Sequence, residues 1–383
     1  MTEATTPLPT IDAAEVTRRT VRSNDFVSCA QAFIDCRTPG SDRKENYSMI
    51  GRGVSQNAGQ VVNLDEPHGF NIGAAAMPHG VINSLHLHFT AEVFLCFRGE
   101  YRLRWGVDGQ EGELTIGEND IASVPTWIFR GFTNTGPDDG WLFTALGMDD
   151  TGGIIWGPSV LREAEGHGLY LTADNELIDT VADGALPEGV PLVEPIAEHH
   201  VAQLRRYTPE EMRRRIVAWD DLRWSSRALL DHALPGGGAE LALVIGYGMT
   251  EDRDQEPLIH NPHGHNIAWL RAAPGKGVSR HRTNASQVLM AKAGEWEVTL
   301  DSGSAPQTVR LGYRDLLSVP AGAWRTLRNV SSDVDATLVV VNSGDGRVRL
   351  EWDEEVIKAA ADAGIAVDHN GYLAPYDLVP RHV

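Results

Sequence analysis

Two histidines and a glutamate, His86, His88 and Glu92, lie within one short stretch of the chain. Side chains two residues apart on a β-strand point to the same face, so His86 and His88 can offer two imidazoles to one ion. Glu92 can return to that side after a bend. Two imidazoles and a carboxylate suit iron(II) or a neighbouring divalent ion, with coordination positions left open for substrate and dioxygen. We expect metal ligation here, in preference to interior histidines that are held only by hydrogen bonds.

The stretch resembles the first signature of the cupin superfamily, Gly-x5-His-x-His-x3-Glu-x6-Gly. Every position of that signature is filled between Gly80 and Gly99. Cupins fold as a small double-sheet jelly roll, also called a double-stranded β-helix. The resemblance implies that this part of the chain is such a barrel.

The second cupin signature, Pro-x-Gly-x2-His-x3-Asn, is matched only at Pro125 and Asn134. Trp127 stands at the glycine position, and Arg130 stands where the family has its fourth ligand, a histidine. An arginine stays protonated and has no lone pair to give to a metal. The metal site is therefore expected to have three protein ligands.

A second copy of these motifs follows at a constant distance of 195 residues, without a gap. The paired positions are His86 and His281, Glu92 and Gln287, Gly99 and Gly294, Pro125 and Pro320, and Asn134 and Asn329. A period this long indicates duplication of a whole domain, because solenoid repeats are far shorter. We expect an all-β dominated chain of two tandem cupin barrels with flanking helices, which is a bicupin.

The two copies differ in their chemistry. The second copy keeps one histidine, His281, but has Thr283 and Gln287 in place of the other histidine and the glutamate. Arg325 again occupies the position of the fourth ligand. A divalent ion would gain little from this set, so we expect the first barrel to carry the chemistry and the second to be a scaffold or a partner surface.

Strand and turn patterns divide the 383 residues into four parts. These are an N-terminal arm (1–46), a first barrel with a helix (47–184), a linker with a helix (185–240) and a degenerate second barrel with a helix (241–383). Helices are expected near Asp25–Phe33, after Gly157, from Thr208 through Trp219, and over Asp353–Ala363.

Composition narrows the partners and the compartment. The net charge of −20 disfavours nucleic acid and anionic membrane surfaces. Only three cysteines are present, Cys29, Cys36 and Cys96, which favours a reducing compartment. The first residues show no signal-peptide pattern, and no segment is apolar enough to span a membrane. We expect a soluble cytoplasmic protein, and a homo-oligomer because symmetric association is common.

Several further side chains are expected around the metal. Arg130 has two open roles: it can pair with Glu92 in a metal-free barrel, or it can bind the carboxylate or phenolate of a substrate. Phe94 and Cys96 share the strand parity of Glu92, and Trp127 would form a pocket wall. His79 is a reserve imidazole, whereas His68 and His263 belong to a repeated Pro-His-Gly turn.

The overall plan resembles the gentisate and salicylate ring-cleaving dioxygenases, bicupins that bind iron through three histidines. The third histidine corresponds to Arg130 here, so Glu92 would have to replace it. The resemblance implies a non-haem iron(II) dioxygenase for a small anionic aromatic substrate, with Glu92 and Arg130 as catalytic residues. Mn(II), Ni(II) and Zn(II) are alternative ions. An isomerase or lyase needs only a Lewis-acid ion and a base, and a small-ligand-binding protein, with or without metal, is the non-enzymatic alternative.

Overall fold

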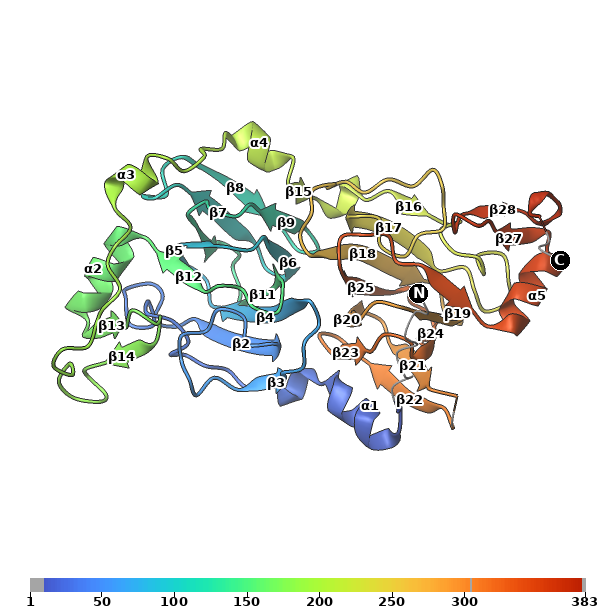
Figure 1. Cartoon of the computed structure of the whole chain (residues 1–383), viewed down its shortest axis with the longest axis horizontal. Coiled ribbons are helices and arrows are strands. Elements are labelled where there is room, and N and C mark those ends of the chain that lie inside the picture. The colour runs from blue at the N-terminus through green and yellow to red at the C-terminus, as the bar shows by residue number, and fades with distance from the viewer. Residues whose placement is uncertain (1–9, 304, 381–383) are drawn as a thin grey trace, which may run out of the picture. The chain divides into compact units, whose positions relative to one another are not determined.

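The structure, a computed structural model, describes residues 10–303 and 305–380. It divides into two compact units, the N-terminal barrel unit (Phe26–Asp221) and the C-terminal barrel unit (residues up to Asp25, and Leu222 onward). In the described residues each unit has one seven-stranded and one five-stranded sheet (Figure 1). The expected fold class, two tandem β-barrels with flanking helices, is confirmed. Residues 1–9 and 381–383, which belong to the predicted arm and second barrel, lie outside the described residues.

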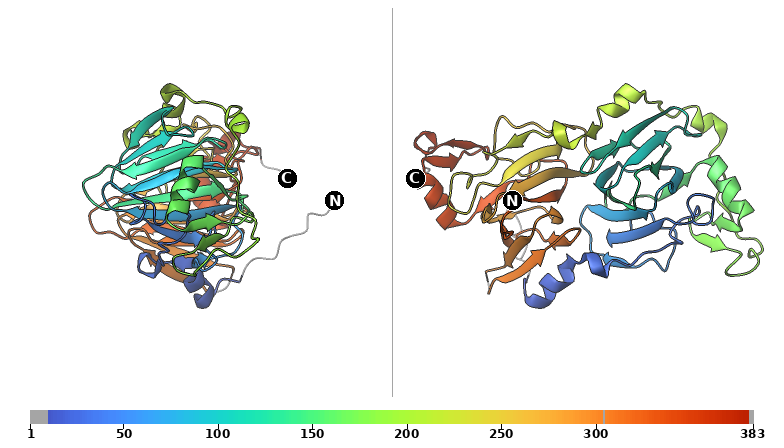
Figure 2. Two further views of the ribbon diagram at one scale, coloured as in Figure 1. Left: turned by 90° about the vertical axis from the view of Figure 1, so that its left-hand side faces the viewer. Right: turned by 180° about the vertical axis from the view of Figure 1, so that it is seen from behind.

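The seven-stranded sheet of the N-terminal barrel unit has the order β15-β9-β6-β11-β4-β2-β3, and the five-stranded sheet has the order β12-β5-β10-β7-β8. The left view of Figure 2 looks onto this unit, with the green helix α2 toward the viewer. Its strands are β2 (Glu45–Ile50), β3 (Val62–Leu64), β4 (Phe70–Met77), β5 (Ile82–His88), β6 (Glu92–Arg98), β7 (Tyr101–Trp105), β8 (Gly112–Ile116), β9 (Ile121–Val124), β10 (Arg130–Asn134), β11 (Gly140–Gly147), β12 (Ile154–Trp156), β13 (Leu169–Leu171), β14 (Leu177–Asp179) and β15 (Ile216–Val217). Its helices are α2 (Pro158–Gly166), α3 (Glu198–Val201), α4 (Pro209–Arg213) and the 3-10 turn η2 (Trp219–Asp221).

The C-terminal barrel unit repeats this plan, with sheet orders β1-β23-β20-β25-β18-β17-β16 and β22-β21-β24-β19-β26. Its strands are β1 (Thr20–Val21), β16 (Trp224–Ser225), β17 (Glu240–Ile245), β18 (His265–Ala272), β19 (Gly277–Thr283), β20 (Gln287–Ala293), β21 (Trp296–Asp301), β22 (Gln307–Leu311), β23 (Leu316–Val319), β24 (Trp324–Asn329), β25 (Ala336–Ser343), β26 (Leu350–Trp352), β27 (Ile365–Val367) and β28 (Leu373–Pro375). Its helices are α1 (Ala13–Arg19), α5 (Glu354–Asp362) and the 3-10 turns η1 (Ser23–Asp25) and η3 (Tyr376–Leu378).

Burial along the strands follows their place in the barrel. In β7 the buried residues Tyr101, Leu103 and Trp105 alternate with more exposed arginines, as expected for a strand with one face in the core. In β6 all residues from Glu92 to Cys96 are buried, because that strand lies in the middle of its sheet with both faces covered. Phe94 and Cys96, which follow Glu92 on this strand, therefore pack in an apolar core.

Each seven-stranded sheet has, at one edge, a two-residue strand that lies outside the repeated barrel sequence. β1 precedes the first barrel in the sequence, yet it pairs with β23 of the C-terminal barrel unit. β15 precedes the second barrel, yet it pairs with β9 of the N-terminal barrel unit. Each short strand covers backbone groups that would otherwise form an open sheet edge.

The boundaries between the two units, at Asp25 and Asp221, fall inside the predicted arm (1–46) and the predicted linker (185–240). The strand β1 lies before the first boundary and pairs in the C-terminal barrel unit, and β15 lies before the second boundary and pairs in the N-terminal barrel unit. The strand-rich region itself begins at Glu45 and, in the second copy, at Glu240.

Two predicted helices are corrected. No helix covers the described residues 26–33, where the chain turns and Cys29 exchanges backbone hydrogen bonds with Asn46. The helix at Pro209 begins with a Thr208 capping box but ends at Arg213, because Ile216 and Val217 pair with β9. The predicted helices after Gly157 and over Asp353–Ala363 are present as α2 and α5.

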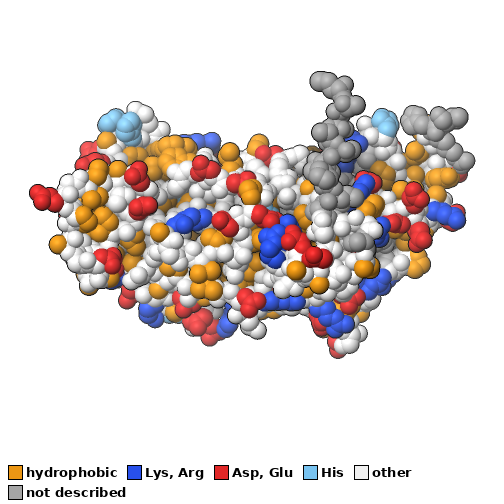
Figure 3. Space-filling model, turned by 60° about the horizontal axis from the view of Figure 1, so that its bottom comes forward, with side chains coloured by type: hydrophobic (Ala, Val, Ile, Leu, Met, Phe, Trp, Pro, Cys, Tyr) orange, Lys and Arg blue, Asp and Glu red, His pale blue; other side chains and the backbone are white. Residues whose placement is uncertain are grey.

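Three observations concern the surface and the thiols. Among the described residues, no helix combines the length and the apolarity that a membrane crossing requires. Cys29, Cys36 and Cys96 are free thiols. On the face drawn in Figure 3, acidic, basic and hydrophobic side chains are interspersed.

One buried position carries different groups in the two units. In the first, Gln56 accepts hydrogen bonds from the Ile34 amide and the Trp156 indole, both at 3.1 Å. The equivalent residue 195 positions later is Glu251, whose carboxylate accepts from the Leu230 amide at 2.6 Å and the Trp352 indole at 2.8 Å. Burial raises the pKa of Glu251 to about 7, although these two donors oppose the rise.

Replacing Glu251 by glutamine should stabilise the chain above neutral pH. A raised folded pKa means that the contribution of Glu251 to stability is present below its ordinary value of 4.5 and is lost as the pH rises through about 7. We expect Glu251→Gln to raise the free energy of unfolding at pH 8 by up to about 3 kcal/mol and to change it little at pH 4. Denaturant titrations at both pH values measure this. Gln56→Glu is the reciprocal control and should destabilise at pH 8, whereas equal effects at both pH values would contradict the explanation.

Candidate metal centre

Strands from both sheets of the N-terminal barrel unit bring the predicted ligands together. His86 and His88 lie on β5 of the five-stranded sheet, and Glu92 is the first residue of β6 in the seven-stranded sheet. A short turn between the strands supplies the bend that the spacing requires. All three side chains are buried, with exposed fractions of 2%, 1% and 4%.

The geometry of the three groups fits one divalent ion. Their donor atoms all lie within 4.8 Å of one another, and Nε2 of His88 is 3.6 Å from Oε2 of Glu92. Ligand atoms that are each bonded to one ion at ~2.1 Å lie roughly 4 Å or less apart. Oε2 of Glu92 also lies 3.1 Å from Nε of Arg130, which forms an ion pair with it. The residues therefore fit a metal ion with only a slight contraction.

Hydrogen bonds prepare the imidazoles for ligation. Nδ1 of His86 lies 2.7 Å from the carbonyl oxygen of Ser84, and Nδ1 of His88 lies 3.5 Å from that of Gly153. Because a carbonyl oxygen only accepts, each Nδ1 donates its hydrogen, and each Nε2 keeps a lone pair. Burial lowers the pKa of both histidines, so both are neutral near pH 7, as metal ligation requires.

Glu92 is held as a carboxylate. Burial alone would raise its pKa, but His88 and the Arg130 guanidinium lower it to about 2. Nε of Arg130 lies 3.1 Å from Oε2 of Glu92. The pair compensates a buried negative charge, which was one of the two roles expected of Arg130.

Arg130 itself is fully buried, and burial lowers its pKa from the ordinary value. Its Nη1 donates to the carbonyl oxygen of Ile128 at 3.1 Å, while Nη2 has no hydrogen-bond partner among the described residues. Arg130 does not belong to the set of residues that line the adjoining cavity. Its pairing with Glu92 is therefore direct, whereas substrate contact stays a prediction.

A buried polar network stands behind His86. Nζ of Lys44 donates to both carboxylate oxygens of Asp35, at 3.0 and 2.8 Å, and to Oδ1 of Asn83. Oδ2 of Asp35 also accepts from the backbone amide of Ser84 at 3.1 Å. Ser84 is the residue whose carbonyl orients His86, so this network fixes the ring against the strand.

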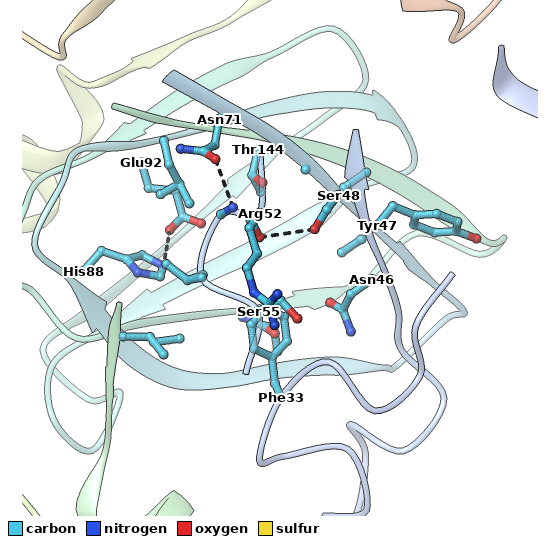
Figure 4. A pocket seen from close by; sticks show the side chains of 18 of the residues that line it. Phe33, Asn46, Tyr47, Ser48, Arg52, Ser55, Asn71, His88, Glu92 and Thr144 are labelled. Carbon is cyan, nitrogen blue, oxygen red and sulfur yellow. Dashed lines mark hydrogen bonds and ion pairs between the residues drawn. The ribbon is translucent and has the colours of Figure 1, made fainter. Parts of the chain in front are cut away.

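The ligands open into a small cavity that is partly open to solvent, in which about 70 Å³ is accessible to the centre of a water molecule. Figure 4 shows His88 and Glu92 on one side of this space and Phe33 and Ser55 on another. Side chains with hydroxyl or amide groups make up much of the wall, together with aromatic ones. The polar neutral ones are Asn46, Ser48, Ser55, Gln60, Asn71, Asn83 and Thr144.

Three predicted lining residues are not in this wall. Phe94 and Cys96 have the expected strand parity, but each step of two residues moves about 6.6 Å along the strand, so they lie in the apolar core. Trp127 is 46% exposed in a turn and packs against Phe89. Nδ1 of His79 donates to the Gly136 carbonyl oxygen at 2.6 Å, and His79 is not part of the metal cluster.

The motifs of the sequence did not point to Asp35, Lys44 and Asn83, which lie before or at the start of the signature. One signal was available: Asp231 repeats the contact of Asp35, because its Oδ2 accepts from the Ser279 amide at 2.6 Å. Asp35 and Asp231 are one residue further apart than the 195-residue repeat of the motifs. A comparison of positions at that fixed distance therefore does not pair them.

The second barrel shows the same framework without the ligand set. Nδ1 of His281 lies 2.8 Å from the Ser279 carbonyl oxygen, as in the first barrel. Nη1 of Arg325 donates to Oγ1 of Thr283 at 3.3 Å and to Oε1 of Gln287 at 3.1 Å. Neutral groups thus replace the second imidazole and the carboxylate.

Comparisons with known proteins identify the fold. No protein-family model matches the sequence, and no curated protein matches it. Among solved structures, Bacillus subtilis oxalate decarboxylase at pH 4.6 is similar with a TM-score of 0.54 at 11% identity, over 99% of this chain and 88% of that chain. Lactobacillus farciminis oxalate decarboxylase in a formate complex gives 0.53 at 12% identity, over 88% of each chain. Momordica charantia 7S globulin gives 0.53 at 11% identity, over 88% and 86%.

The chain therefore has the bicupin fold, two cupin barrels in tandem. Identities this low establish the fold alone, because one fold hosts many functions. The similar structures include both oxalate decarboxylases and a 7S globulin, so the function has to be argued from the site of this chain.

Glutamine at position 92 should abolish metal binding and leave the fold intact. The second barrel already contains this arrangement, with Gln287 facing Arg325. We expect Glu92→Gln to weaken Mn(II) or Fe(II) binding at least about 100-fold, because it removes the anionic ligand. Metal titration and thermal unfolding measure the two effects, with Glu163→Gln on the exposed face of α2 as the control. Unchanged metal affinity would show that Glu92 serves only to pair with Arg130.

Proposed function

We propose that this chain is a metal-dependent enzyme whose N-terminal barrel acts on a small carboxylated or hydroxylated substrate. One observation carries the proposal: three buried donor atoms, two with free lone pairs and one anionic, converge within 4.8 Å beside a cavity. Burying the carboxylate of Glu92 costs stability. The second barrel folds with the neutral Gln287 at the equivalent position, so the fold itself does not require this charge.

The reaction class that we propose first is that of a non-haem iron(II) dioxygenase. A site of two histidines and one carboxylate with open positions is typical of such enzymes. Phe33 and Trp156 contribute aromatic surface to the cavity wall, which suits an aromatic ring. The substrate would be an aromatic acid with a hydroxyl group, and dioxygen the second substrate.

A lyase is the second candidate, and the similar structures favour it. Oxalate decarboxylases share the fold, and Mn(II) centres have been assigned in the Bacillus subtilis enzyme. A lyase of this kind would use Mn(II) and a small carboxylate substrate without consuming dioxygen. A non-enzymatic small-ligand-binding protein is the remaining alternative, and 7S globulin and vicilin structures share the fold.

The residues have separable roles in this proposal. His86, His88 and Glu92 would hold the ion, which supplies Lewis-acid chemistry and, if it is iron(II), access to reaction with dioxygen. Arg130 keeps Glu92 ionised and fixes its orientation. The Ser84 carbonyl keeps the hydrogen of His86 on Nδ1, away from the cavity.

Turnover measurements distinguish the candidates. The protein is purified without oxygen, loaded with Fe(II) or Mn(II), and tested with hydroxylated aromatic acids and with small dicarboxylates. We expect oxygen consumption with Fe(II) and an aromatic acid, abolished in His88→Ala and retained in Thr283→Ala, the matched change in the second barrel. Release of carbon dioxide without net oxygen consumption would replace the dioxygenase by the lyase. Metal-loaded protein without either activity would favour the binding protein.

A further inference from the structure

Arg52 lines the same cavity, on the loop between β2 and β3. In Figure 4 its side chain extends away from Glu92 toward Ser55 and Phe33. The residue is exposed, so it lies where the cavity meets solvent. Its Nη2 donates to the carbonyl oxygen of Asn57 at 2.8 Å, and no ion pair of the described residues involves it. Its remaining donors are available to a ligand.

The loop that carries Arg52 is held in a defined conformation. Gly51 and Gly53 have φ values of +66° and +64°, a region that favours glycine. A Cβ at Gly51 would lie 2.0 Å from Oδ1 of Asn71, and the same oxygen accepts from the Gly53 amide at 3.0 Å. Nδ2 of Asn71 in turn donates to the Met148 carbonyl oxygen at 2.7 Å. The position of the Arg52 backbone is therefore fixed at the cavity.

The second barrel keeps this loop but lacks the charge. Gly246 and Gly248 have φ values of +65° and +53°, and Asn266 again lies against them. Tyr247 takes the place of Arg52. Because the two loops share their backbone framework, loop geometry does not explain the guanidinium. It is present only in the barrel that has the metal-ligand set.

The charges around the cavity favour an anionic ligand. Among the described residues that line it, Glu92 is the one acid, and Arg130 already compensates it. Arg52 and a bound divalent ion would then be uncompensated positive charges. The whole chain carries a net charge of −20, which repels small anions at long range. A local positive charge at the cavity entrance, such as Arg52, can attract an anion despite the negative potential of the whole chain.

Gln60 supplies a second donor in the same wall. Its side chain is 6% exposed, its Oε1 accepts from Oγ of Ser55 at 3.1 Å, and its Nε2 has no hydrogen-bond partner among the described residues. In the second barrel Gln255 keeps the equivalent bond from Thr250, but its Nε2 donates to the Leu241 carbonyl oxygen at 2.6 Å. Burying an unsatisfied amide costs stability unless a ligand or water satisfies it. The spare donor is again found only beside the metal-ligand set.

From these observations we infer that Arg52 is a specificity-determining residue, which binds an anionic group at the end of the substrate remote from the metal. The amide of Gln60 is a second donor for the same ligand. The inference rests on the proposed function and names its substrate class: a small acid with one end for the metal and an anionic group at the other. It also moves the recognition of the substrate charge from Arg130, which pairs with Glu92, to Arg52.

The test compares diacids with their half-esters. Succinate, glutarate and the monomethyl ester of each are titrated into Mn(II)-loaded and metal-free protein, and binding is measured by calorimetry. We expect the wild type to bind at least one diacid about tenfold more tightly than its ester, because a guanidinium–carboxylate pair is lost in the ester. Arg52→Gln should reduce this preference to nearly equal binding. Arg162→Gln, an exposed charge change on α2 in the same unit, should preserve it.

Two results would overturn the inference: a wild type that prefers no diacid over its ester, or an Arg52→Gln variant that keeps the full preference. Arg52→Gln should leave Mn(II) affinity unchanged, so loss of metal in this variant would also contradict a role confined to recognition. The two proposals fail in different measurements. If the proposed function is wrong, the wild type takes up no Mn(II). If the role of Arg52 is wrong, the ratio of diacid to ester binding does not change in Arg52→Gln.

Discussion

The compensation of one buried carboxylate is the constraint on which the site depends. Glu92 is almost fully buried, and it remains ionised because the adjacent Arg130 guanidinium offsets the cost of removing the carboxylate from water. Arg130 stands at the position of the fourth ligand in the cupin signature, where it places a fixed positive charge beside Glu92. The proposed metal site is therefore left with three ligands. The neutral, oriented imidazoles of His86 and His88 complete the set.

Because the chain contains two copies of the barrel, the second copy shows how the fold is built without the candidate metal ligands. Ser48 and Asn83 of the cavity wall correspond to Leu243 and Val278 in the second copy, where both residues belong to a continuous apolar core. The carboxylate has become an amide at Gln287. Loss of the ligands and filling of the interior therefore go together, as expected if a cavity is kept only where it serves a site. The Arg325 guanidinium persists because neutral oxygens satisfy its donors.

Strand periodicity and the repeat predicted much of this structure. The spacing of His86 and His88 placed both on one face of β5, and the 195-residue repeat predicted the second barrel. Depth along a strand was not predictable, because parity does not distinguish the cavity from the core, as Phe94 shows. Contacts between segments distant in the sequence, such as Lys44 with Asn83, depend on the fold itself. Arg52 could have been noticed from its two flanking glycines and their recurrence around Tyr247.

Metal stoichiometry in matched variants tests the central claim, that one barrel binds metal and the other does not. The wild type, His86→Ala and His281→Ala are loaded with Mn(II) without oxygen, desalted and measured by elemental analysis. The account predicts one ion per chain in the wild type, one in His281→Ala, and essentially none in His86→Ala. Two ions per chain in the wild type, or an ion that survives in His86→Ala and is lost in His281→Ala, would contradict it.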